Sequence, residues 1–159
     1  MLKGFFAVPQ PQNEPVLNYA PGSPERAALK AALDEGRSKV WEIPMYIGGK
    51  KVTEGKRLEI RPPHNHQHLL ATFPEGDAST VNVAIDAALA AKESWEALPW
   101  EQRAAIFLKA ADLLAGPYRA RINAATMLGQ SKNAFQAEID SACELIDFLR
   151  FNVQYMTEI

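Results

Sequence analysis

Gln136–Tyr155, QAEIDSACELIDFLRFNVQY, decides how this sequence is interpreted. The stretch contains the only cysteine among the 159 residues, Cys143, next to a carboxylate, Glu144, in a run with the spacing of a partly buried helix. A cysteine and a glutamate can act as nucleophile and base, so their positions on the helix determine which chemistry is possible.

A helical projection at about 100° per residue divides this stretch into two stripes and a polar sector. The aliphatic stripe comprises Ile139, Ala142, Ile146, Leu149, Val153 and Met156. The second stripe comprises Ala137, Ser141, Glu144, Phe148, Phe151 and Tyr155. The narrow sector between them holds Asp140, Cys143, Asp147, Arg150 and Gln154, so we expect Cys143 to be exposed. Within that sector, Asp147 and Arg150 are three residues apart and can pair across a turn.

Of the two neighbours, Glu144 is the stronger candidate for function. Acids one turn to either side of Cys143, Asp140 and Asp147, raise the pKa of a thiol, which is the reverse of what a nucleophile needs. Glu144 shares its stripe with aromatic rings, where a carboxylate needs a partner, a raised pKa or a cleft. The alternative for Glu144 is an edge position from which its side chain reaches water.

The first half of the chain divides into an arm, a helix and a region of strands. Residues 1–22 are rich in proline and predict an extended arm. Residues 23–38 predict a helix, because Ser23-Pro24-Glu25 supplies an N-cap, a first-turn proline and an acid. Residues 43–74 predict short strands, two of them joined by a tight turn at Gly48-Gly49.

Residues 77–159 predict a helical layer, with breaks at Pro99, at Gly116-Pro117 and near Gly129. Asp77 or Ser79 is expected to cap its first helix, whose apolar stripe we expect to pack in a core. The last helix is expected to begin near Asn133 and to be still running at Ile159, as in the front of a larger protein. The short strands lack the strand–helix alternation of a cofactor-binding sheet.

Composition excludes several classes of function. A net charge of −2 gives no basic surface for nucleic acid, and no apolar run approaches the roughly 20 residues that span a bilayer. A single cysteine fits a reducing compartment, and we expect a cytoplasmic location.

Two further motifs have simpler interpretations than binding. Gly48-Gly49-Lys50-Lys51 lacks the glycine spacing of a phosphate-binding loop. His64, His66 and His68 alternate, but they follow Pro62-Pro63 and have no cysteine or acid nearby, so we expect a solvated turn and no metal site.

The chain resembles the N-terminal region of aldehyde dehydrogenases. The resemblance rests on IPMYIGGKKV, HNHQHLLATFPEGD and AIDAALAAKESWEALPWEQRAAIFLKAADLLAGPYRARINAATMLGQSK. Two further stretches, NEPVLNYAPGSPERAALKAAL and QAEIDSACELIDFLRFN, are similar to the 1-pyrroline-5-carboxylate (L-glutamate γ-semialdehyde) dehydrogenase branch of that family.

The resemblance implies an α/β fold of the aldehyde dehydrogenase type, of which these residues form the mainly helical N-terminal part, with short antiparallel strands and no complete Rossmann sheet. It implies NAD-dependent oxidation of L-glutamate γ-semialdehyde to glutamate in proline catabolism, and a homo-oligomer. It assigns Glu144 to the substrate site, and none of the 159 residues to the catalytic cysteine, the general base or the NAD site. The alternative is an autonomous helical interaction module derived from such an enzyme.

Overall fold

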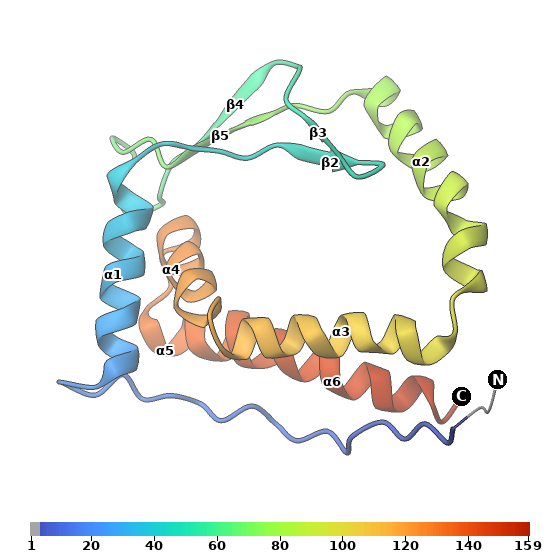
Figure 1. Cartoon of the computed structure of the whole chain (residues 1–159). Helices are drawn as coiled ribbons and strands as arrows, with labels where there is room; N and C mark the ends of the chain where they lie inside the picture. The colour runs from blue at the N-terminus through green and yellow to red at the C-terminus, as the bar shows by residue number, and fades with distance from the viewer. Residues whose placement is uncertain (1–3) are drawn as a thin grey trace.

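The computed structural model of the chain describes residues 4–159 and is mainly helical with short strands, as the sequence predicted. Its helices pack in two pairs, one at the left and one at the bottom of the view in Figure 1. Helix α1 (Pro24–Ser38) lies against α4 (Arg119–Gln130), and α3 (Trp100–Ala115) lies against α6 (Glu144–Met156). The predicted last helix therefore ends at Met156 and does not continue to Ile159.

A three-stranded sheet covers one end of the α1–α4 pair. Strand β5 (Ala71–Pro74) lies in its middle, antiparallel to β4 (Arg57–Ile60) and parallel to β1 (Trp41–Glu42). The expected antiparallel pairing is confirmed for β4 and β5, whereas the parallel strand β1 lies just before the region predicted as strands and was not predicted.

The predicted turn at Gly48-Gly49 is present. It joins β2 (Met45–Ile47) to β3 (Lys50–Val52) in an antiparallel hairpin, with Ile47 opposite Lys50. Both glycines have positive φ, 57° and 76°, as a two-residue type I′ turn requires.

Side-chain caps fix where the helices begin. The Ser23 side chain accepts a hydrogen bond from Arg26 N at the start of α1. Asp77 accepts one from Thr80 N at 2.8 Å and caps α2 (Ala78–Ala97) in a reciprocal capping box. Helix α4 ends at Gln130, near Gly129 as expected, and its C-cap residue Ser131 lies in the left-handed region (φ 58°).

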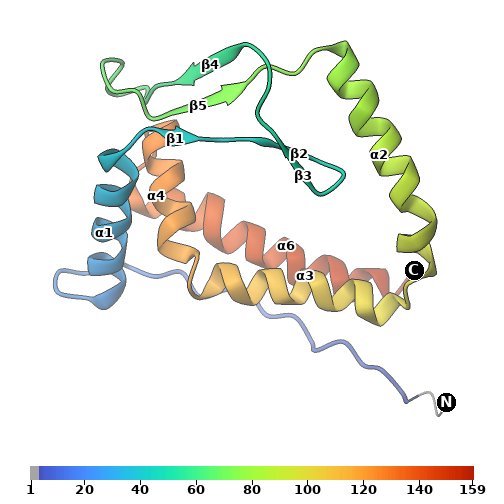
Figure 2. The ribbon, with the colours of Figure 1, turned by 45° about the horizontal axis from the view of Figure 1, so that its top comes forward.

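Helix α2 stands apart from the two helix pairs (Figure 2). All its residues are described and none is buried; Val83 and Leu89 are 58% and 63% exposed. The expectation that its apolar stripe packs in a core is therefore not met by the described residues. Among residues 4–159, no helix is long and apolar enough to cross a membrane.

The described part of the predicted arm, residues 4–22, is an extended segment that runs antiparallel to the last helices; residues 1–3 lie outside the described residues. Asn13 and Glu14 bond to Asp147 in α6, whereas Leu17 and Tyr19 bond to Glu138. Glu138 begins a π-helix, η1 (Glu138–Cys143), which follows the short helix α5 (Ala134–Ala137) and leads directly into α6.

A buried polar network, the arm clamp, fastens this segment to the helices. Its members are Glu14, Leu17, Tyr19, Arg119, Asn123 and Glu138. Glu138 is fully buried and accepts hydrogen bonds from Leu17 N at 2.8 Å, Tyr19 Oη at 2.6 Å and Asn123 Nδ2 at 2.8 Å. Arg119, 7% exposed, donates to the carboxylates of both Glu138 and Glu14.

The outer end of the arm is held by a second layer of ionic contacts. Arg150 Nη1 donates to Glu14 Oε2 at 2.7 Å, and the two oxygens of Asp147 accept from Glu14 N and Asn13 Nδ2, each at 2.7 Å. Asp147 and Arg150, expected to pair with each other, thus both bind the arm.

The clamp keeps Glu138 ionised. Burial alone raises the pKa of a carboxyl, but hydrogen bonds from Arg119, Tyr19, Leu17 N–H and Asn123 outweigh it, and the pKa of Glu138 lies below its usual value. Burial, and after it the hydrogen bond to Glu138, raises the pKa of Tyr19, so the phenol stays a donor.

Replacing Glu138 by glutamine tests the clamp. The Glu138→Gln substitution leaves the buried Arg119 with one carboxylate partner, and we expect the free energy of unfolding to fall by about 3 kcal/mol. Urea denaturation followed by circular dichroism measures the change. Glu144→Gln, the same substitution at an exposed position six residues later, is the control and leaves stability within about 0.5 kcal/mol. Equal effects of the two variants would contradict the clamp.

The clamp also predicts a pH dependence. Because the pKa of Glu138 is lower in the folded than in the unfolded protein, its contribution is complete above the unfolded pKa of about 4.3. That contribution is lost as the pH falls through the lower, folded pKa. Unfolding curves from pH 7 to pH 3 should therefore show an acid loss of stability that is smaller in Glu138→Gln. An equal loss of stability at low pH in both proteins would show that protonation of Glu138 is not linked to unfolding.

Candidate functional site

Cys143 and Glu144 face opposite environments. Cys143, the last residue of η1, is 5% exposed, so the expectation that it lies in an exposed sector is wrong. The aliphatic stripe was placed correctly at Ala142, Ile146 and Val153, which are buried. The projection misses the burial of Cys143 because the arm covers the polar sector, in which Asp147 and Arg150 also bind the arm.

The surroundings of Cys143 keep its thiol protonated. Arg119 Nη2 lies 3.5 Å from Sγ, and Pro15 O and Glu138 Oε1 lie at 3.9 Å. Burial, followed by the charge of Glu138, raises the pKa of Cys143 to about 11, although Arg119 opposes this. The predicted direction was right, but its main causes are burial and Glu138. Asp140, which we had expected to contribute, instead pairs with Lys132 at 2.6 Å.

The Glu144 carboxylate is exposed at the first residue of α6. Its aromatic neighbours one and three turns on, Phe148 and Tyr155, are 60% and 52% exposed. The second stripe is thus open at Glu144, Phe148 and Tyr155, whereas Ala137 at its start is fully buried. Glu144 has the exposed position that was the alternative interpretation. A carboxylate on an open aromatic face can accept hydrogen bonds from whatever covers it. Its role in a substrate site stays a prediction.

A cavity of about 360 Å³ adjoins this face between α3, α6 and the end of α2. Phe148, Trp95 and Phe107 line it together with Arg103, whose Nε is buried and has no hydrogen-bond partner among the described residues. Glu144 does not line this aromatic recess, but Phe148, one helical turn further along α6, does.

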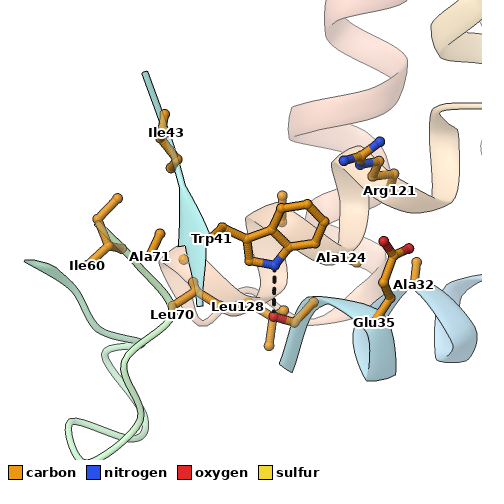
Figure 3. Close-up of a pocket in the computed structure, with 13 residues that line it drawn as sticks. Ala32, Glu35, Trp41, Ile43, Ile60, Leu70, Ala71, Arg121, Ala124 and Leu128 are labelled. Atoms are coloured by element: carbon orange, nitrogen blue, oxygen red, sulfur yellow. Dashed lines mark hydrogen bonds between the residues drawn. The ribbon is translucent and has the colours of Figure 1, made fainter. Parts of the chain in front are cut away.

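A second cavity, of about 320 Å³, lies between α1, α4 and the sheet (Figure 3). Trp41 projects into it, with Nε1 donating to Gly36 O at 3.2 Å and the guanidinium of Arg121 5.3 Å from the ring centroid. Its lining is mostly aliphatic, with Glu35 and Arg121 as its charged residues. Neither Cys143 nor Glu144 lines it, so it is separate from the candidate site.

The histidine cluster lies in a turn, as expected. His64 Nδ1 is 2.8 Å from Ser131 Oγ, and His66 is exposed. His68 differs from the prediction of a solvated position, because it is half-buried and its Nε2 has no hydrogen-bond partner among the described residues.

Comparison with known proteins supplies what the geometry alone does not. A family model described as the aldehyde dehydrogenase family matches residues 51–159. The Delta-1-pyrroline-5-carboxylate dehydrogenase of Agaricus bisporus is 53% identical over 97% of this chain, which covers 28% of that protein. The mitochondrial Delta-1-pyrroline-5-carboxylate dehydrogenase of Homo sapiens is 50% identical over 92% of this chain, which covers 26% of it.

Solved structures agree with these relatives. The Delta-pyrroline-5-carboxylate dehydrogenase from Mycobacterium tuberculosis bound with NAD superimposes with a TM-score of 0.96 and 47% identity, over 99% of this chain and 30% of that one. The chain therefore spans less than a third of the length of these relatives. Since the family model matches most of the residues and the backbone matches almost all of them, the chain belongs to the aldehyde dehydrogenase family.

Proposed function

We propose that these residues form the N-terminal part of an NAD-dependent dehydrogenase that oxidises L-glutamate γ-semialdehyde, the open form of 1-pyrroline-5-carboxylate, to glutamate. The observation that carries the proposal is the match over 99% of the chain, at 47% identity, to a Delta-pyrroline-5-carboxylate dehydrogenase. The arm clamp and the helix pairs supply the rigid part that this segment contributes.

The exposed apolar surface supports a role within a larger fold. Helix α2 buries none of its residues, and Phe148 on α6 and Phe107 on α3 are 60% and 43% exposed. Apolar side chains left open on three helices favour a surface on which further sequence of the same protein packs.

The catalytic thiolate comes from sequence outside these residues. In the proposed reaction a cysteine thiolate adds to the aldehyde carbon, the adduct loses a hydride to the cofactor, and water hydrolyses the thioester that remains. Cys143 cannot serve, because it is buried and its pKa is raised to about 11. Glu144 contributes its carboxylate to the substrate site, either by holding a water or by acting on the pKa of the catalytic thiol.

NAD accepts the hydride in this reaction, and its binding residues also lie elsewhere. A dinucleotide diphosphate binds a glycine-rich turn between a strand and a helix. Gly48-Gly49 instead joins two strands, and in the β5–α2 connection the carboxylate of Asp77 occupies the helix N-terminus. The described glycines therefore do not fit the cofactor. We further propose that the intact enzyme is a homo-oligomer, which light scattering of the full-length protein tests.

The activity is tested on the full-length protein. We expect NADH formation, followed at 340 nm, when 1-pyrroline-5-carboxylate and NAD are supplied, and none from the 159 residues expressed alone. Turnover by the 159 residues alone would contradict the assignment of the thiolate to other sequence. A full-length protein without dehydrogenase activity, but with a stable, cooperatively folding N-terminal segment, would favour the alternative interaction module.

Kinetics of the two neighbours separate their roles. In the full-length enzyme, Glu144→Ala should lower kcat by about 10-fold or more, because a carboxylate at the substrate site is lost. Cys143→Ser should leave kcat within about 2-fold, since a hydroxyl can keep the contacts to Arg119 and Pro15. Glu144→Gln, which keeps size and removes charge, shows whether ionisation matters. Loss of activity in Cys143→Ser would overturn the assignment of both residues.

A further inference from the structure

The π-helix η1 contains one residue more than an α-helix would need over the same rise. Glu144 N donates to Ile139 O, five residues earlier, where an α-helix bonds four residues back. Side chains after such a segment are turned back by about one α-helical step, roughly 100°, relative to those before it.

The burial pattern shows what this extra residue achieves. Ala137, before η1, and Ile146, after it, are both fully buried and nine residues apart. In an unbroken α-helix they would be separated by about 900°, half a turn out of register, and would point to opposite sides. With one step removed the offset is about 80°, and both face the interior.

Each buried side is held by its own contacts. Upstream, Glu138 is fixed in the arm clamp. Downstream, Ile146 packs with Ala111 and Ala142 in the core between α3 and the last helices. Glu144 lies between these two anchored residues, and its side chain is exposed.

Two polar side chains tie the π-helix to α4. The Asn123 amide, fully buried, donates to Glu138 Oε2 at 2.8 Å and accepts from Ser141 Oγ at 3.0 Å. Ser141 Oγ also lies 2.5 Å from Ala137 O. One amide thus bridges the first and fourth residues of η1. Since π-helices are rare and persist where surroundings hold them, this bridge is suited to keep the extra residue in place.

We propose that Asn123 and Ser141 are positioning residues that hold the π-helix and thereby set the direction of Glu144. The inference rests on the proposed function, because it takes Glu144 as a substrate-site residue. When the bridge is lost, η1 can relax toward an α-helix and Glu144 turns with it. A group displaced by about 1 Å can lose on the order of 100-fold in rate, so a partial rotation is measurable.

The test uses Ser141→Ala in the full-length enzyme, since it removes one hydroxyl from a half-buried position. We expect kcat for the aldehyde to fall by about 10-fold while the KM for NAD stays within about 2-fold. Ser141→Thr, which restores a hydroxyl, should recover most of kcat. Asp140→Ala, next to Ser141 but exposed, removes the pair with Lys132 and is the control that should leave kcat unchanged. Asn123→Ala is the second variant, with the same expected direction.

A double-mutant cycle with Glu144→Ala decides between positioning and general damage. If Ser141 acts through Glu144, Ser141→Ala has no further effect on kcat in the Glu144→Ala background. Additive losses, or an unchanged kcat in Ser141→Ala alone, would overturn the inference and leave the proposed function standing. If Glu144→Ala itself retains full kcat, the substrate-site role of Glu144 and the inference both fail, while the NADH assay of the wild type tests the dehydrogenase separately.

Discussion

The ion pair between Glu138 and Arg119 is the constraint on which the rest of this structure depends. Taking two charges out of water costs several kcal/mol for each ion, so the pair is tolerable only where every remaining polar atom finds a partner. Here the partners come from two places: the arm gives Leu17 N–H, Tyr19 and the carboxylate of Glu14, and α4 gives Asn123. The buried ion pair therefore requires the hydrogen-bonding groups of the arm. The arm follows an extended path because those groups have to reach Glu138 and Arg119.

The same pair explains why adjacent residues differ so sharply. Glu138 has to face inward to meet Arg119, and Ile146 has to face inward to meet α3, and one extra residue between them satisfies both demands. Cys143 is buried beneath the arm, where Pro15 O and Glu138 Oε1 each lie 3.9 Å from its sulfur. Glu144 is left outside. Cys143, although its residue type is reactive, is thus a buried packing residue, and Glu144 lies on the exposed aromatic face.

Features written in short stretches of sequence were predicted well. The caps at Ser23 and Asp77 and the glycine turn at 48–49 depend on backbone chemistry within four residues, which the sequence displays directly. The buried stripe through Ile146 and Val153 was also recovered, because α6 downstream of η1 is a regular helix.

Features set by distant partners were missed. Nothing near Glu138 in the sequence indicates that Arg119 and Tyr19 will satisfy it, so the clamp and the π-helix were not predicted, and Cys143 was misplaced with them. The parallel β1–β5 pair joins residues about thirty positions apart through a two-residue strand too short for any periodicity. The sequence placed Glu144 correctly on the face that carries Phe148 and Tyr155. Its environment could not be predicted, because it depends on what packs against that face.

The separation of the clamp partners along the chain has a consequence for biosynthesis. The hydrogen bonds from Leu17 and Tyr19 to Glu138 span 121 and 119 residues, and the Arg150–Glu14 bond spans 136. Closing such long loops is entropically costly and slows folding. The arm leaves the ribosome before its partners and can dock only after α4 and the π-helix have emerged. Before the arm docks, Arg119 and Glu138 lack the hydrogen bonds that it supplies, and the proline-rich composition of the arm favours an extended conformation.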